Sequence, residues 1–300
     1  MRRREFLAAT GTVTVGTSLF PTSWLSAVEE KPIKVLYYTR STGYEHSAVK
    51  RGENGELSVS EQALIDMGKR AGFEVTCSKD GRVFDGDLDQ YDLFAFYSCG
   101  NQCVEGKRPQ NKPMTADGKQ RLLDAVADGK GFIGFHSGAD TFHSGREIDP
   151  YVTMVGAEFM GHGTQQPGRL TIASPEFPGL GDYRGKKDVT IEREEWYTFR
   201  NFGHDLHVIL VQETDSLKKE HERDKFLHSR PPFPQTWARK HGKGRVFYTS
   251  FGHVHDVWTN AFFQSLTLGG IAWAVGNVDV DIPANIEKVT PGAWEVPVKE

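Results

Sequence analysis

Short apolar runs that alternate with helix-like segments limit the fold of this chain more than any other feature of its sequence. In the first half, strands are predicted at Ile33 to Thr39, Phe73 to Ser78, Leu93 to Tyr97 and Gly131 to Phe135. The first and third lack the clean polar–apolar alternation of a half-exposed strand, so they suit strands buried on both faces. The β-α-β-α-β order predicts an α/β fold with a doubly wound, mostly parallel sheet and helices on both faces.

The helices between these strands are marked by their ends. Ser58 and Glu61 form a capping-box pattern at the start of a helix predicted from Ser58 to Ala71, and Gly72 ends it. A second helix is predicted from Thr115 to Asp128 and is also followed by a glycine. Each helix therefore supplies the crossover that two parallel strands require.

The second half of the chain adds more strands. They are predicted at Arg169 to Ala173, Asp188 to Glu192, Val208 to Gln212, Thr236 to Arg239 and Arg245 to Ser250, with a closing helix from Asn260 to Val275. No internal repeat or low-complexity linker divides the sequence. We therefore expect one domain over residues 32–276, followed by an irregular tail over residues 277–300.

The N-terminus carries a twin-arginine pattern. Arg3 and Arg4 are followed by one spacer and then Phe6-Leu7, ahead of an uncharged stretch rich in small residues. A small-residue cleavage site at residues 25–27 completes a signal peptide over residues 1–27. The alternative is a membrane anchor, but Thr, Gly, Ser and Pro21 weaken insertion. We expect a periplasmic or extracellular protein, exported folded.

Composition excludes several classes of function. The net charge is −4, so no basic surface is expected for nucleic acid. No later stretch is apolar and long enough to span a membrane, so no stable span is expected after cleavage. The three cysteines allow at most one disulfide, with Cys99 and Cys103 the nearest pair, and they do not make a zinc knuckle.

The candidate site follows from the fold class, because ligands of open α/β sheets bind at the carboxyl ends of the strands. Polar loops follow four predicted strands there, and three of the loops contain histidine: 42–46, 98–101, 136–140 and 251–255. His136 lies between Gly134 and Gly138, whose small size allows a tight turn that raises the side chain from the sheet. A histidine in that place argues against acyl-enzyme chemistry.

Two further pairs have a geometric argument. If the chain is extended at 194–199, Glu195 and Tyr197 share a face, since strand residues i and i+2 point the same way. A carboxylate beside a phenol suits a general base with an orienting donor, and equally a buried hydrogen-bond network. His253 and His255 also share a face if extended, which suits two ligands of one metal ion.

These segments together resemble the ThuA-like family, named for trehalose utilisation. The resemblance is carried, in order, by Gly131-Phe-Ile-Gly-Phe-His-Ser-Gly-Ala-Asp140, Tyr151, Val155-Gly-Ala-Glu-Phe159, His162, Glu194-Glu-Trp-Tyr197, Gly244-Arg-Val-Phe-Tyr248 and His253. It implies a flavodoxin-like fold related to class I glutamine amidotransferases. His136 stands where those enzymes have a nucleophilic cysteine, so amidotransfer is not expected. The sequence departs from the family pattern at Glu194, a common Asp, and at Gly163, often Pro.

The first hypothesis is an exported enzyme of carbohydrate catabolism that acts on a sugar or an oxidised (3-keto) glycoside by acid–base chemistry. Glu195 would be the base and His136 and His253 the acid or ligands, with Asp140 orienting His136. Tyr197 completes the catalytic set. The residues predicted to bind substrate are His46, Asn101, His162 and His255.

The second hypothesis is a metal-dependent hydrolase or lyase that uses His46, His136, Glu195 or His253 to hold a divalent ion such as zinc. It ranks below acid–base chemistry because no HExxH-like spacing fixes the ligands. The third is a non-catalytic sugar-binding module that uses some of the six tryptophans and nine tyrosines as stacking platforms. The first two require the four side chains to meet within about 4–6 Å.

Overall fold

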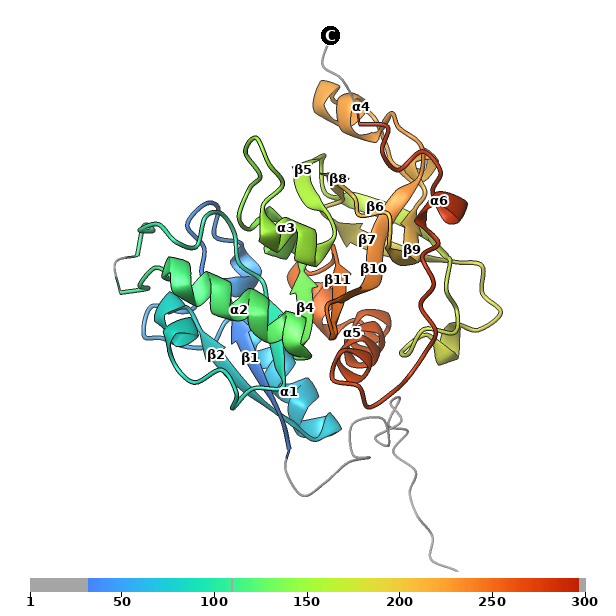
Figure 1. Cartoon of the computed structure of the whole chain (residues 1–300). Helices are drawn as coiled ribbons and strands as arrows, with labels where there is room; N and C mark the ends of the chain where they lie inside the picture. The colour runs from blue at the N-terminus through green and yellow to red at the C-terminus, as the bar shows by residue number, and fades with distance from the viewer. Residues whose placement is uncertain (1–31, 109, 297–300) are drawn as a thin grey trace, which may run out of the picture.

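The computed structural model describes residues 32–108 and 110–296 (Figure 1). The predicted twin-arginine segment, residues 1–27, lies outside the described residues, as do residues 297–300 of the predicted tail. Among the described residues, no helix has both the length and the apolar character needed to cross a membrane.

The central element of the fold is a nine-stranded sheet. Its strand order is β2-β1-β3-β4-β11-β10-β9-β6-β7. Its first five strands are all parallel and have the 2-1-3-4-5 order of the flavodoxin-like fold. They are β1 (Ile33–Tyr38), β2 (Phe73–Ser78), β3 (Leu93–Phe96), β4 (Gly131–Phe135) and β11 (Gly244–Thr249). The predicted doubly wound α/β fold is confirmed.

The other four strands extend this sheet in an antiparallel manner. They are β10 (Phe233–His241), β9 (His207–Gln212), β6 (Gln166–Ile172) and β7 (Asp188–Glu194). Within the nine-stranded sheet only β6 and β10 run against the rest, so the sheet is mostly parallel, as predicted. A separate two-stranded ribbon pairs β5 (Glu158–His162) with β8 (Tyr197–Arg200).

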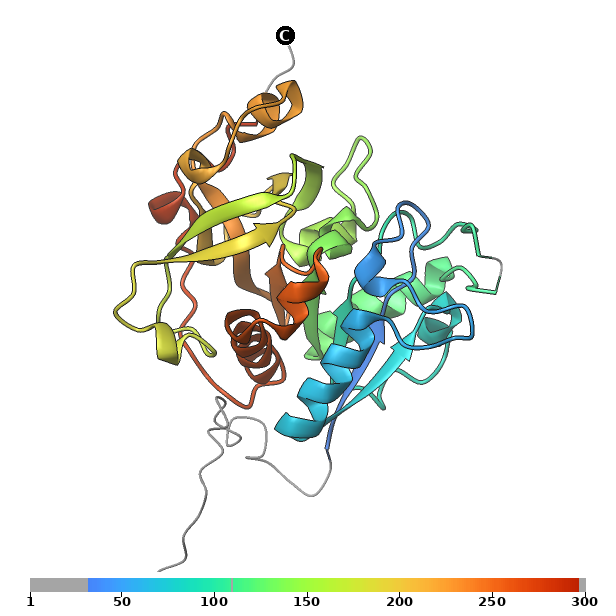
Figure 2. The same cartoon turned by 180° about the vertical axis from the view of Figure 1, so that it is seen from behind.

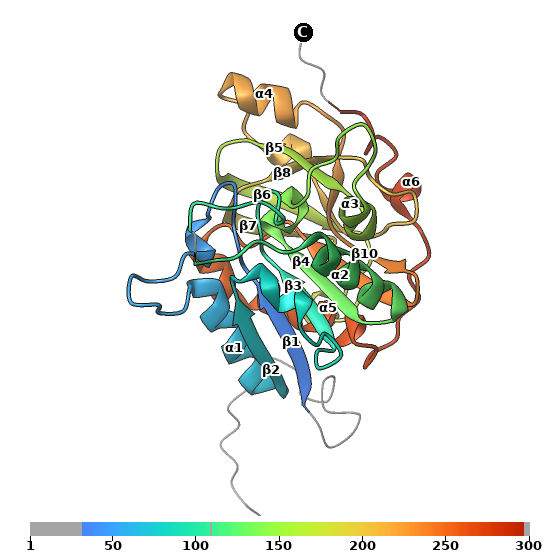
Figure 3. The same ribbon diagram turned by 60° about the vertical axis from the view of Figure 1, so that its left-hand side comes forward.

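Helices cover both faces of the sheet and close two cores. On one face α1 (Val59–Ala71) and α5 (Ala261–Ala274) contribute to one core together with Val35 and Tyr37 of β1. On the other face α2 (Ala116–Asp128) and α3 (Pro150–Val155) contribute to a second core together with Leu36 and Tyr38 of β1. Figures 1 and 2 show these helix pairs in front of opposite faces, and Figure 3 shows α1 and α2 on either side of β1 and β3.

Capping chemistry sets the helix ends as the sequence indicates. The hydroxyl of Ser58 accepts from the N–H of Glu61, and the Glu61 carboxylate accepts from the N–H of Ser58. Gly72 then ends α1 in the left-handed region with φ 86°. The sequence analysis missed β5, β8, α3, α4 (Glu222–His228) and α6 (Ile286–Val289), the last within the tail predicted to be irregular.

The C-terminal segment returns along the antiparallel half of the molecule. It contains α6 (Ile286–Val289), and the N–H of Asn285 donates to the carbonyl of Leu206 at the start of β9. The buried guanidinium of Arg230 donates to the carbonyl of Ala293. These contacts fix the described part of the segment onto the domain.

The cysteines are free thiols in the described chain. The thiol of Cys99 donates to Asp140 at 3.0 Å, whereas the thiol of Cys103 faces the carbonyl of Thr115. The nearest pair in sequence therefore points at different partners and forms no disulfide.

Candidate functional site

Four side chains from loops at the carboxyl edge of the sheet converge on one point. His46 follows β1, His136 follows β4, His253 follows β11, and Glu195 joins β7 to β8. One potential ligand atom from each lies within 4.8 Å of the others. The sequence analysis required these four residues to meet, and the structure brings them together.

His136 occupies the strained turn that its neighbouring glycines indicated. Its backbone lies in the left-handed region with φ 41°, where a side chain other than glycine's is uncommon. Its Nδ1 is 2.7 Å from the carbonyl of Ser250. A carbonyl only accepts, so Nδ1 carries the hydrogen and the neutral ring directs the lone pair of Nε2 into the cluster. The ring of Tyr197 covers it, with centroids 3.9 Å apart.

His253 has the opposite tautomer. The Gln165 amide nitrogen lies 2.7 Å from His253 Nε2, and Arg193 donates to the Gln165 amide oxygen at 2.8 Å. Arg193 thereby fixes the amide so that its N–H₂ faces the imidazole. His253 Nε2 then accepts, and its Nδ1–H points into the cluster.

A triangle of three atoms forms the centre of the cluster. His253 Nδ1 lies 3.1 Å from Glu195 Oε2 and 3.2 Å from His136 Nε2, and the third edge, from His136 Nε2 to Glu195 Oε2, is 3.4 Å. The single hydrogen on His253 Nδ1 serves two acceptors, so the triangle has an excess of lone pairs. Ligand atoms held tetrahedrally at zinc bond lengths lie about 3.3 Å apart, which matches these edges.

Glu195 is held as a carboxylate. Burial raises its pKa, but the adjacent ring of His136 and the hydrogen bond from His253 outweigh burial and bring the pKa below the usual range. Its other oxygen lies 3.2 Å from His162 Nδ1, which also donates to the carbonyl of Gly163 at 2.9 Å. A carboxylate with so low a pKa is a weak proton acceptor but a good ligand for a cation.

His46 closes the buried side of the cluster. It is 3% exposed, and its Nδ1 has no hydrogen-bond partner. Burial, followed by the neighbouring His136 and His253, lowers the pKa of His46 to about 2, so the ring is neutral. Its ring centroid lies 4.8 Å from that of His136 and 5.2 Å from that of His253. A neutral, buried imidazole with an unpartnered nitrogen fits a metal ligand.

The chain is not continuously extended at 194–199, because β7 ends at Glu194 and β8 begins at Tyr197. Even so, Glu195 and Tyr197 both face His136. Between them Trp196 is buried and donates to the carbonyl of Gln166 at 2.8 Å.

Three predicted site residues lie outside the cluster. Asp140 does not orient His136, because it accepts from Cys99 and pairs with His143 at 2.6 Å while a backbone carbonyl orients the imidazole. Asn101 is exposed and accepts from the N–H of Cys103 within its own turn. His255 starts a 3-10 turn instead of continuing an extended segment, and its Nε2 contacts Ser47 at 3.1 Å.

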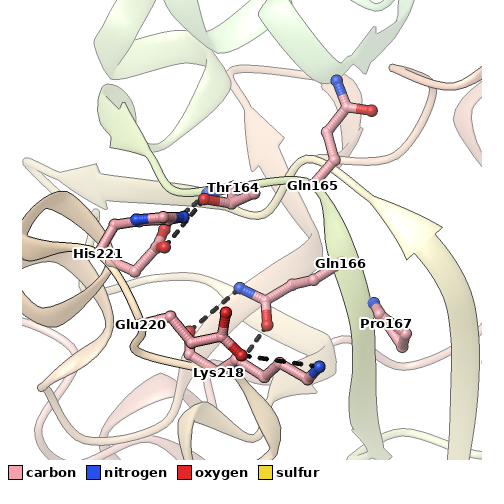
Figure 4. Close-up of a pocket in the computed structure, with 8 residues that line it drawn as sticks. Thr164, Gln165, Gln166, Pro167, Lys218, Glu220 and His221 are labelled. Carbon is pink, nitrogen blue, oxygen red and sulfur yellow. Dashed lines mark hydrogen bonds and ion pairs between the residues drawn. The ribbon is translucent and has the colours of Figure 1, made fainter.

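The sequence analysis missed Gln165, which no motif marks. Gln165 lines a pocket together with Gln166, Lys218, Glu220 and His221, and Figure 4 shows its side chain directed away from theirs. None of the four converging residues lines that pocket. Gln165 therefore lines this pocket and also reaches the histidine cluster through its side-chain amide.

A protein-family model and solved structures both match this chain. The model of the ThuA family, described as trehalose utilisation, matches residues 34–274. A ThuA-like protein from Bacteroides uniformis ATCC 8492 has a TM-score of 0.62 at 17% identity, covering 83% of this chain and 94% of its own. One from Parabacteroides merdae ATCC 43184 has a TM-score of 0.57 at 18% identity, covering 87% and 97%. No curated protein matches the chain. At these identities the structural likeness shows the fold.

Proposed function

We propose that this chain, which belongs to the ThuA family, is a divalent-metal-dependent enzyme that acts on a sugar or an oxidised glycoside. The observation that carries the proposal is the convergence of ligand atoms from His46, His136, Glu195 and His253 within 4.8 Å. The family's description, trehalose utilisation, supports the carbohydrate substrate.

The electrostatics of the cluster favour a metal over the metal-free acid–base chemistry that the sequence analysis ranked first. Glu195 was expected to be the base, but its lowered pKa leaves it little affinity for a proton near neutral pH. His46 has a pKa of about 2 and is not an acid under the same conditions. Both features suit ligands, because metals bind carboxylates and neutral imidazoles.

The residues fit the ion with one adjustment. His136 already directs a lone pair inward, and Glu195 is ionised. His253 would move its hydrogen from Nδ1 to Nε2. The Gln165 amide would give up its hydrogen bond from Arg193 and rotate, so that its oxygen accepts the hydrogen of His253. A bound divalent ion would supply Lewis acidity to a carbonyl or hydroxyl oxygen of the substrate.

His162 and Tyr197 are the residues placed to handle protons. The Nδ1–H of His162 is engaged by Gly163 and Glu195, so the neutral ring keeps a lone pair on Nε2, and its side chain is 29% exposed. Burial holds the pKa of Tyr197 well above its usual value, so the phenol stays a donor.

For a 3-keto glycoside the reaction we propose is elimination. His162 Nε2 takes the proton from the carbon next to the ketone, and the C–H electron pair becomes the new C=C bond. The glycosidic C–O bond then breaks, and the same proton passes from His162 to the departing oxygen.

The test is metal analysis of purified protein together with turnover of trehalose and 3-keto-trehalose followed by NMR. We expect about one equivalent of a divalent metal, loss of turnover on chelation and its return on reconstitution. His136→Ala should lose both metal and turnover, whereas His204→Ala, an exposed histidine paired with Glu287, should keep both.

Other outcomes would identify the competing functions. Turnover that survives complete removal of metal would establish the acid–base mechanism. A sugar that binds and is recovered unchanged by both metal-loaded and metal-free protein would establish a binding module.

A further inference from the structure

We infer that Glu194 is a positioning residue that sets the distance between the two segments carrying Glu195 and His253. The inference rests on the proposed metal centre, because both segments supply its ligands. No motif or comparison gives Glu194 this role. It is the last residue of β7 and is fully buried.

The Glu194 carboxylate accepts three backbone hydrogen bonds. Oε1 accepts from the N–H of Glu195 at 2.8 Å and from the N–H of His253 at 3.2 Å. Oε2 accepts from the N–H of Gly252 at 3.0 Å. One side chain therefore binds the backbone of both ligand residues at once, across 59 positions of sequence.

The loop that Glu194 holds is fixed from its other side as well. The phenol of Tyr97 and the indole of Trp258 both donate to the carbonyl of Gly252, at 3.1 and 3.0 Å. Gly252 has φ 125°, which favours glycine. The peptide before His253 is thus tied at its N–H by Glu194 and at its carbonyl by two aromatic donors. Second-sphere contacts of this kind orient ligands and tune metal affinity.

Glutamine at this position removes an acceptor in either amide orientation. If its nitrogen replaces Oε1, two backbone N–H groups lose their acceptor, and if it replaces Oε2, the N–H of Gly252 does. The amide N–H₂ then faces a backbone N–H, so the loop must move. Aspartate retains both oxygens but is one methylene shorter and cannot span both segments as Glu194 does.

The experiment measures Co²⁺ affinity and the visible absorption spectrum of the Co²⁺-loaded protein for wild type, Glu194→Gln and Glu194→Asp. Glu158→Gln is the matched control, because Glu158 is also fully buried and accepts from Ser144, Arg200 and Asn201 away from the cluster. We expect Glu194→Gln to bind Co²⁺ about 10–100-fold more weakly with an altered spectrum, as other second-sphere changes do.

The Co²⁺ affinity of Glu194→Asp should lie between those of wild type and Glu194→Gln. The aspartate variant also provides the test if the glutamine variant does not fold. The control should lose thermal stability while its Co²⁺ affinity and spectrum stay those of wild type. If wild type binds Co²⁺ and both Glu194 variants match its affinity and spectrum, the positioning role is wrong. If wild type itself binds no Co²⁺, the proposed metal centre is wrong and the inference falls with it.

Discussion

At the scale of single residues, the chemistry of the site depends on which imidazole nitrogen carries hydrogen. The carbonyl of Ser250 selects the Nδ1–H tautomer of His136, so Nε2 presents a lone pair whenever the ring is neutral. The tautomer of His253 is selected by the amide of Gln165, which can present either an acceptor or a donor. Gln165 therefore controls whether His253 offers a proton or a lone pair to the cluster.

Replacing Gln165 with glutamate is expected to tighten metal binding. A carboxylate at this position can only accept, so it stabilises the Nε2–H tautomer of His253 and leaves Nδ1 as a ligand. We expect affinity for Zn²⁺ to rise roughly 10-fold, measured by competition with a chromogenic chelator. Gln165→Leu, which offers no acceptor, should bind more weakly than wild type. Equal affinities in all three proteins would show that this side chain does not select the tautomer.

His143 provides a pH-dependent contribution to stability that is separate from the cluster. Its Nε2 pairs with Asp140 at 2.6 Å and its Nδ1 lies 3.4 Å from Glu158, which Arg200 also contacts. The hydrogen bond that His143 donates to Asp140 is the largest cause of its raised pKa. A raised folded-state pKa gives stability that is fully present below the unfolded pKa of about 6.5 and lost as pH rises through the folded value.

His143→Gln should therefore lower Tm more at pH 5.5 than at pH 9. The comparison is the difference in Tm between wild type and variant across this range, with His204→Gln as the exposed control. A gap in Tm that stays constant or widens toward pH 9 would contradict the assigned sign.

At the scale of elements, the start of α1 is stabilised by the capping box of Ser58 and Glu61. Ser58→Ala removes the N-cap acceptor of the Glu61 N–H and should lower the free energy of unfolding by about 1 kcal/mol. Ser58→Thr keeps the hydroxyl and should retain most of that stability. Urea unfolding of the three proteins measures both changes, and an alanine variant as stable as wild type would show that the cap contributes little.

Elements with their own local signal were predictable. The strand Gly131–Phe135 and the helix from Ala116 to Asp128, after its Thr115 cap, follow from apolar runs, caps and glycine stops. β10 is longer than predicted, from Phe233 to His241, because a proline and an irregular register at Pro234–Trp237 hide its start in the sequence. Strands β5 and β8 form a separate two-stranded ribbon and pair with each other. Neither strand has an apolar run or a turn motif that predicts it from the sequence.

Part of the site was predictable from the positions of its residues at strand ends. The carboxyl ends of parallel strands meet at one edge, so His46, His136 and His253 were expected together. Two expectations are wrong: that Asp140 orients His136, and that His255 shares an extended face with His253. They depended on a side-chain direction and on a turn that strand geometry does not fix. Gln165 was missed because its side chain contacts Arg193 and His253, which are distant from it in sequence.

At the scale of the whole molecule, the cluster lies where two halves of the sheet join. The parallel half supplies the three histidines from the loops after β1, β4 and β11. The antiparallel extension and the ribbon supply Glu195, Tyr197 and His162. The ligand set is complete only when both halves have folded, so a metal bound here before export would require transport of the folded protein.

We propose on this basis that the chain is exported folded through the twin-arginine route, to the periplasm or beyond. Replacing both Arg3 and Arg4 with lysine should retain the protein in the cytoplasm, because that route recognises the arginine pair. Fractionation of cells producing each variant measures export, and Arg2→Lys, outside the pair, should be exported normally. Mass spectrometry of the exported form separates cleavage after Ala27 from retention as an anchor. Normal export of the double-lysine variant would refute the twin-arginine route while leaving the metal centre to its own tests.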